Sequence, residues 1–422
     1  MCGKLYYSDL FWMQQSQLIP HLFRTEFRKI VSVLSKLFGL EHIEIAEDIV
    51  SDTFLLAAET WGKKGLPENP TAWLYLVAKN KTKDYLKRNQ LFNKKIVGEI
   101  TASSSGSAEM DIDLTEKNIT DSQLQMMFAI CHPAIPAEAQ IGLSLRILCG
   151  FGIDEIADAF LSNKETINKR LFRAKEKLRE EKIRMEFPES GEIEKRLQAV
   201  ATTLYLLFNE GYYSSSQNKI IKKDLCIEAM RLTLMLVENT PTNKPFVNAL
   251  LSLMCFHASR FDARINAHGE IVLYEEQNTD LWDIELIRRG DYYLNKSASG
   301  NELSKYHLEA AIAFWHTKKQ DDKIKWNMIL RLYNQLLQIE YSPMTALNRT
   351  YALAKAENSL VAIKEAEKLK LTENHLYFSL LGQLYIEVDE SKALDNFKKA
   401  LGKARTTNDK LVIQAKIDKL KK

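Results

Sequence analysis

The sequence IPAEAQIGLSLRILCGFGIDEIADAFLSNKETINKRLFRAKEKLREE, residues Ile135–Glu181, predicts three short helices, of which the last two form a helix-turn-helix. Gly150 and Gly152 break the first helix, and a short second helix follows them. Ser162 or Asn163 can cap the third helix, because either side chain can accept a hydrogen bond from a free backbone amide. The apolar residues of the first helix recur at helical spacing, at Ile141, Leu145 and Leu148.

The third helix has a polar surface of the kind that binds DNA. Ile167, Leu171 and Ala174 are expected to face inward. The remaining positions are candidates for DNA contact: Lys164, Glu165, Thr166, Asn168, Lys169, Arg170 and Arg173. Cations neutralise phosphates, and Asn, Arg or Lys can bond to base edges in the major groove. The segment therefore favours DNA binding, and the alternative is a plain three-helix bundle with a solvated basic face.

Length and composition predict a chain of two to four domains with packed cores, since 422 residues with 45% apolar content are sufficient for them. A net charge of +3 excludes a generally basic nucleic-acid coat protein. The charge is segregated instead: residues 79–95 hold seven Lys or Arg and one acid, whereas residues 41–59 hold six acids and no Lys or Arg. This pattern indicates one face for nucleic acid and another for a basic partner.

Other features favour a cytoplasmic protein. The five cysteines lie far apart, without a CxxC pair, and are expected to be reduced, buried thiols. The sequence has no apolar run of the roughly 18 residues that a membrane span needs, and no signal-peptide pattern. We therefore expect no contact with a membrane.

The chain reads as all-α, in four regions. Residues 15–95 form an amphipathic helical block with a basic end, and residues 96–122 form a flexible acidic linker that contains SSSGS. Residues 123–185 carry the helix-turn-helix. Residues 190–422 form a long helical extension.

The extension contains a repeat of 34 residues, the tetratricopeptide period, which relates Leu347 to Leu381 and Tyr351 to Tyr385. Small residues such as Gly382 would let paired helices approach closely. The sequence therefore predicts a helical array resembling tetratricopeptide repeats, and any other array of helical hairpins is the alternative.

Two helices of the first block carry charge on one side. Glu44, Asp48 and Asp52 recur every four residues and form an acidic stripe, which favours a basic protein partner. The following helix, 73–88, presents an aromatic, an amide and cations that suit opened DNA, because bases stack on a ring while ammonium groups hold phosphates. Its candidates are Trp73, Lys79, Asn80, Lys83, Lys87 and Arg88. Core packing is the alternative for Trp73.

These blocks together resemble a bacterial RNA polymerase sigma factor of the extracytoplasmic-function type. LFRTEFRKIVSVLSKLFG and AEDIVSDTFLLAAETW resemble the part of region 2 that binds the polymerase clamp helices. NPTAWLYLVAKNKTKDYLKRN resembles the part that melts and reads the −10 element, and residues 135–179 resemble region 4, which reads the −35 element. The resemblance covers about residues 20–183. AVATTLYLLFNEGYYSSS and KKDLCIEAMRL, further on, are similar to the subgroup with a long helical extension.

The resemblance implies site residues and partners. Glu44, Glu47, Asp48 and Asp52 would contact core RNA polymerase. The loop 65–71, with Pro67, Glu68 and Asn69, would accept a flipped −10 base, and Trp73, Lys79, Asn80 and Lys83 would hold the opened strand. The third helix of the helix-turn-helix would enter the −35 major groove. A protein or ligand partner of the extension would modulate activity.

Two other functional classes compete with this interpretation. An enzyme is disfavoured, because His257, Asp262 and His268 lack the spacing of a metal site and no P-loop or GxGxxG occurs. We therefore expect no catalytic residue, no metal and no cofactor. A helix-turn-helix regulator that acts without polymerase is the stronger alternative, although it would not need the acidic stripe.

Overall fold

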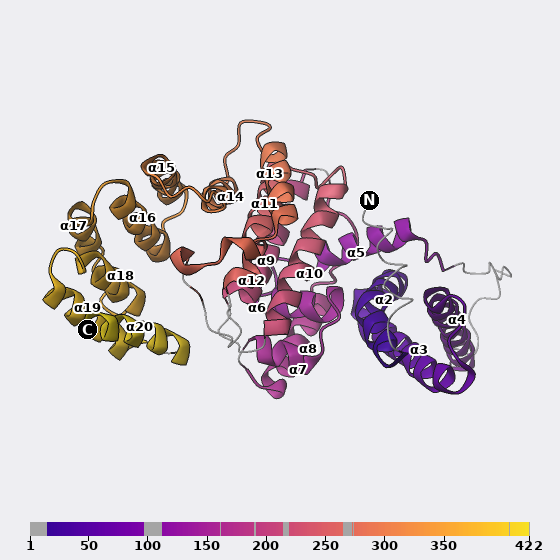
Figure 1. Cartoon of the computed structure of the whole chain (residues 1–422). Coiled ribbons are helices and arrows are strands. Elements are labelled where there is room, and N and C mark those ends of the chain that lie inside the picture. The colour runs from indigo at the N-terminus through magenta and orange to yellow at the C-terminus, as the bar shows by residue number, and fades with distance from the viewer. Residues whose placement is uncertain are drawn as a thin grey trace. The chain divides into compact units, whose positions relative to one another are not determined.

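The computed structural model describes residues 15–96, 112–160, 162–189, 191–213, 219–264, 272, 274–404 and 406–421. Within these ranges every regular element is helical and there is no strand, which confirms the all-α class. The chain forms two compact units, residues 1–206 and 207–422. The boundary falls inside one helix, α9 (Ile193–Tyr213), labelled in Figure 1.

The first unit begins with a three-helix block in which α2, α3 and α4 pack on one another (Figure 1). Phe27, Val50 and Leu74, one from each helix, are at most 1% exposed and form its core. Gly65 ends the second helix with a φ of +84°, which favours a residue without a Cβ. The elements are α2 (Gln15–Phe38), the 3₁₀ turn η1 (Leu40–His42), α3 (Ile43–Lys64) and α4 (Pro70–Ile96).

The next helix, α5 (Glu116–Ile130), lies partly within the stretch expected to be a linker. Thr115 caps it by accepting from the Asn118 amide, and Ile119 and Leu124 are buried on α5, which packs against α2. These apolar positions outweigh the acidic composition that suggested a tether. Most of the acidic stretch, 97–111, lies outside the described residues.

The segment predicted to carry a helix-turn-helix is helical, and short turns separate its helices. Gly150, with a φ of +75°, follows the helix break, and Asn163 caps the third helix by accepting from the Thr166 amide at 2.8 Å. Its inward face is as expected, since Ile167, Leu171 and Ala174 are at most 4% exposed. The elements are α6 (Ala137–Leu143), the π-helical turn η2 (Ser144–Leu148), α7 (Ile153–Ala159) and α8 (Lys164–Glu180).

The first half of α9 belongs to this unit through two side-chain hydrogen bonds. Arg196 donates to the Phe128 carbonyl at 2.6 Å, and the Thr203 hydroxyl donates to Oε1 of Gln140 at 2.7 Å. Gln140 is only 7% exposed, so Thr203 satisfies a buried amide oxygen. The unit is therefore complete only when the start of the extension is present.

The second unit consists of helices and short 3₁₀ turns (Figure 1). They are α10 (Lys219–Glu238), α11 (Pro245–Ala258), α12 (Phe261–Arg264), η3 (Tyr274–Glu276), η4 (Thr279–Leu281), α13 (Ile284–Ser297), α14 (Lys305–His316), α15 (Lys323–Ile339), α16 (Pro343–Ala356), α17 (Ser359–Leu369), α18 (His375–Tyr385), α19 (Glu390–Lys403) and α20 (Thr407–Leu420). From α14 onward each helix contacts the next, as in an array of hairpins.

The repeat detected in the sequence coincides with this array. Leu347 and Leu381, which are 34 residues apart, both lie in the core at 4% and 5% exposure. A Cβ added to Gly382 would stand 2.8 Å from the ring of Phe397, so α18 and α19 approach as closely as the missing side chain allows. The small residue therefore has the role that the sequence predicted.

Replacing Gly382 by alanine is expected to destabilise the second unit by about 1–3 kcal/mol, because the buried Phe397 ring must shift to accept the methyl group. Gly402 on α19 is the matched control, since nothing lies within 4 Å of a Cβ there. Gly402→Ala should stabilise the helix by up to about 1 kcal/mol. Urea unfolding measures both, and shifts of the same sign would contradict the close packing.

Two histidines of the second unit are half-buried and pack against aromatic rings. His316 packs edge-on against Tyr274, with ring centroids 5.0 Å apart, and against Trp326, at 5.7 Å. His257 packs against Tyr212, with centroids 4.7 Å apart. Burial, reinforced by the positive charge of Arg260, lowers the pKa of His316 to about 3 and holds the pKa of His257 well below its usual range. Both imidazoles are therefore neutral in the folded protein.

Candidate functional site

The four acidic residues of α3 that were predicted to contact polymerase divide into two pairs. Asp48 and Asp52 are exposed, and the Asp52 carboxylate lies 3.4 Å from the ammonium group of Lys81 on α4. Leu55, one turn further along the helix, is 60% exposed. An exposed leucine beside two carboxylates forms a mixed apolar and acidic surface, which suits a basic protein partner. We name Asp48, Asp52 and Leu55 the outer face of α3.

The other two acids, Glu44 and Glu47, turn toward α8 of the same unit. Lys175 Nζ lies 2.6 Å from the Glu47 carboxylate and 3.6 Å from that of Glu44. Arg179 lies 3.3 Å from Glu44, and Arg146 of η2 lies 3.4 Å from Glu47. The four acids that the sequence grouped together thus do not share one surface.

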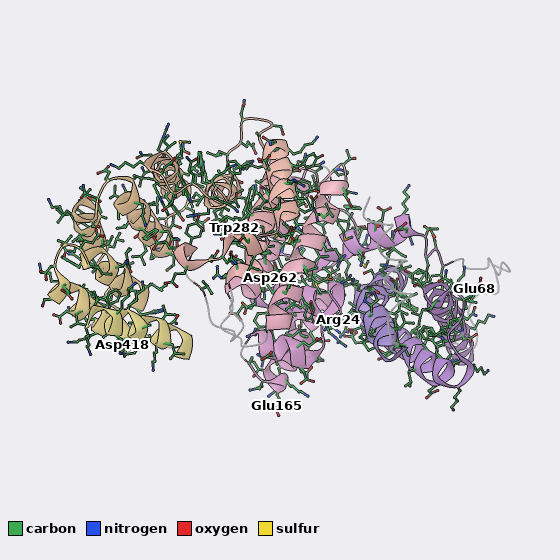
Figure 2. The ribbon with its side chains drawn as sticks, in the orientation of Figure 1. Arg24, Glu68, Glu165, Asp262, Trp282 and Asp418 are labelled. Atoms are coloured by element: carbon green, nitrogen blue, oxygen red, sulfur yellow. The ribbon has the colours of Figure 1, made fainter. Side chains whose placement is uncertain are left out.

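The loop between α3 and α4 carries three of the residues predicted for the −10 element. Glu68 is exposed and is labelled in Figure 2. Asn69 caps α4, because its side-chain oxygen accepts from the Ala72 amide at 3.0 Å. Pro67 is half-buried and Pro70 occupies the first position of α4. The loop is therefore rigid at its helix-side end, and Asn69 has a structural role that the sequence reading missed.

The predicted single-strand surface of α4 is mostly accessible. Asn80 and Lys87 are exposed, and Leu76 on the same face is 58% exposed. Trp73 is half-buried and packs edge-on against the buried Trp61, with ring centroids 5.3 Å apart. The other predicted cations are half-buried or exposed: Lys79, Lys83 and Arg88.

The candidate recognition helix α8 exposes most of the predicted residues. Those fully on the surface are Lys164, Glu165, Thr166, Asn168, Lys169 and Arg173. Lys164 pairs with Asp154 at 2.6 Å, and Glu165, labelled in Figure 2, projects from the N-terminal end of the helix. Arg170 is half-buried, because its guanidinium lies 3.1 Å from Glu138 and over the Phe160 ring.

Two features of α8 were not predicted. Phe172 is 65% exposed, one turn after Asn168, on the face that points away from the unit. A cleft of about 680 Å³ runs between α8 and the segment that leads into α6. Its lining includes Thr166, Lys169, Arg170, Arg173 and Lys177, opposite Glu138. The exposed phenylalanine was the available signal, since an apolar residue at a polar helix position is unusual in a solvated helix.

The structure describes two of the three residues that the sequence analysis considered as metal ligands. His257 packs against the Tyr212 ring, whereas Asp262 is exposed and pairs with Lys223 at 3.2 Å. His268 lies outside the described residues. In the part of the chain that the structure describes, no group of three or more His, Cys, Asp or Glu side chains could hold a metal ion. No helix among the described residues is both long and apolar enough to cross a membrane.

Comparisons with known proteins found the following similarities. "Uncharacterized protein R00370" of Rhizobium meliloti (strain 1021) is 30% identical over 387 residues, which cover 90% of each chain. The chain belongs to this family of proteins. Residues 22–92 of the chain match Sigma-70 region 2, and residues 196–298 match a family of unknown function, DUF6596. The crystal structure of the yeast Tom70 aligns with 96% of this chain and 88% of its own, at 14% identity and a TM-score of 0.29.

Proposed function

We propose that this protein is an alternative sigma factor of the extracytoplasmic-function type, which binds core RNA polymerase and directs it to promoters. The supporting observation is the presence, in one chain, of a sigma-70 region 2 block with an exposed acidic outer face and a helix-turn-helix with an exposed polar helix. A regulator that acts without polymerase would need only the second element.

The outer face of α3 would bind the polymerase, and α4 with its preceding loop would hold the opened −10 strand. Asn80 and Lys87 would contact the strand, and Leu76 offers an apolar surface on which a base can rest. Because Trp73 packs against Trp61 and is half-buried, only the accessible part of its ring would contribute to this surface.

Helix α8 would read the −35 element in the major groove. Asn168 can form two hydrogen bonds with an adenine edge, and Phe172 can contact a thymine methyl group. The cations that line the cleft would neutralise the phosphates of the adjacent strand. Arg170 forms an ion pair with Glu138. It would either position the helix through this pair or leave Glu138 and bind DNA.

The test is transcription in vitro from supercoiled template with core polymerase, with and without the protein. A sigma factor yields new, discrete transcript starts, whereas a regulator that does not bind core polymerase yields none. The extension is proposed to support activity. A chain that ends after Tyr213, and so keeps all of α9, should then initiate less than the full chain; more initiation would indicate an inhibitory extension.

Asn168→Ala is expected to relax sequence preference at one −35 position, with a loss of about 1–3 kcal/mol for the preferred base. Lys177→Ala is the matched comparison on the same helix, because Lys177 lines the basic cleft. Its loss should weaken binding to all sequences equally and reduce the salt dependence by about one phosphate contact. Fluorescence anisotropy on a set of single-base variants measures both, and the same profile for both variants would exclude base reading by Asn168.

A further inference from the structure

Helix α8 and helix α3 are joined within the first unit by a network of ion pairs. Lys175 is shared between Glu47 and Glu44, and Glu47 is shared between Lys175 and Arg146. The side chains of Lys175 and Glu47 are only 16% and 12% exposed. Arg179 extends the network to Glu44 at 3.3 Å. The acids therefore already contact cations of the same chain.

A second contact, between α2 and α7, joins the same two parts of the unit. Arg24 of α2 lies 2.9 Å from Glu155 of α7, and its guanidinium lies over the Phe151 ring. Gly150 approaches the Arg24 carbonyl so closely that a Cβ there would stand 3.4 Å from the oxygen. α2 also packs against η2, and α8 against η1. The helix-turn-helix is thus held against the region 2 block at two places.

The strength of this contact is suited to reversible opening. An isolated exposed ion pair contributes about 0–1 kcal/mol, but a network whose central pair is largely desolvated contributes more and depends less on salt. The outer parts, at Arg179 and Arg24, are 41% and 48% exposed and remain sensitive to salt. A competitor that offers its own cations to the acids can therefore replace α8.

We propose that the C-terminal half of α8 is an internal ligand of α3, which masks Glu44 and Glu47 until a partner with a similar basic surface displaces it. The partner that fits presents two cations one helical turn apart, as Lys175 and Arg179 do. This proposal rests on the proposed function in taking core polymerase as that partner. The apparent affinity for polymerase is then the affinity of the open form multiplied by the fraction of the protein that is open.

The experiment first measures the contact itself, without polymerase or DNA. Spin labels are placed at the exposed positions Ser51→Cys on α3 and Asp158→Cys on α7, in the full chain with Cys2→Ser. Cys131, Cys149, Cys226 and Cys255 are buried and should not react. We expect a single narrow distance distribution for the wild type, and a broader, longer one for Lys175→Ala/Arg179→Ala. Lys177→Ala/Arg184→Ala is the control, because Lys177 pairs with Glu181, four residues further along the chain, rather than with an acid of α3.

A charge-exchange variant distinguishes loss of the contact from loss of folding. Glu47→Lys should open the unit, and Glu47→Lys/Lys175→Glu should restore the narrow distribution. If Lys175→Ala/Arg179→Ala gives the same distribution as the wild type, or the exchange fails to restore it in a folded protein, the internal contact is overturned.

The second readout is the affinity of the full chain for core polymerase in the absence of DNA. We expect Lys175→Ala/Arg179→Ala to bind about three- to tenfold more tightly than the control variant. Equal affinities would overturn masking. If no variant binds polymerase while the distances respond as expected, the internal contact stands and the proposed function fails.

Discussion

Reversing the charge of Asp48 and Asp52 to lysine is expected to abolish binding of the full chain to core RNA polymerase while leaving the fold intact. Both side chains are exposed, and Asp52 contacts only Lys81 among the pairs described for it, so their loss should cost little stability. Lysine placed against a basic partner costs several kcal/mol, and each 1.4 kcal/mol weakens binding about tenfold.

The matched control changes the net charge equally at exposed acids on other helices, with Glu194→Lys and Asp395→Lys. Co-purification with tagged core polymerase measures binding, and circular dichroism verifies the helical content. Unchanged co-purification of the Asp48→Lys/Asp52→Lys protein would remove α3 as the polymerase contact. Equal loss in the control would mean that net charge, rather than this face, determines binding.

The second unit is expected to lose about 4 kcal/mol of stability between pH 7 and pH 5, through His257 and His316. Each imidazole is neutral when folded, whereas the unfolded state takes up a proton below about pH 6.5. Stability therefore falls with decreasing pH, by about 1.4 kcal/mol per pH unit for each histidine, until the folded pKa is reached. For His316 that limit lies near pH 3.

Urea unfolding at pH 7, 6 and 5 measures this effect, with tryptophan fluorescence, to which the buried Trp326 contributes, as the reporter. His316→Phe is the informative variant, because the ring contacts with Tyr274 and Trp326 can be kept while the titrating group is lost. The pH dependence should fall by about half. The same pH dependence in wild type and variant would mean that other groups govern acid unfolding.

Much of the fold was predictable because its signals are local. The spacing of Ile167, Leu171 and Ala174 identified the buried face of α8, and Gly382 identified a close helix pair. Local periodicity gives the face of a helix but does not give its neighbour. The side chains that depend on distant partners were therefore misread or missed.

Glu47 and Trp73 illustrate that limit. The family resemblance grouped Glu47 with Asp48, but the partners of Glu47, Lys175 and Arg146, lie about a hundred or more positions away in the sequence, so no local pattern could reveal them. Trp73 could be a stacking platform or a core residue, and the sequence did not reveal its contact with Trp61, which leaves it half-buried. Likewise, Asn69 proved to be a helix cap because α4 begins at Pro70.

The bond between Thr203 and Gln140 has a consequence for the order in which the protein folds on the ribosome. The two residues are 63 positions apart, so Gln140 leaves the exit tunnel well before its partner. At about 5–20 residues per second, this delay is roughly 3 to 13 s. During that interval the nascent helix-turn-helix has a buried amide oxygen without its native hydrogen bond. The segment expected to bind DNA therefore reaches its final form only after synthesis has entered the extension, so a chain that stops before α9 lacks this bond of the folded first unit.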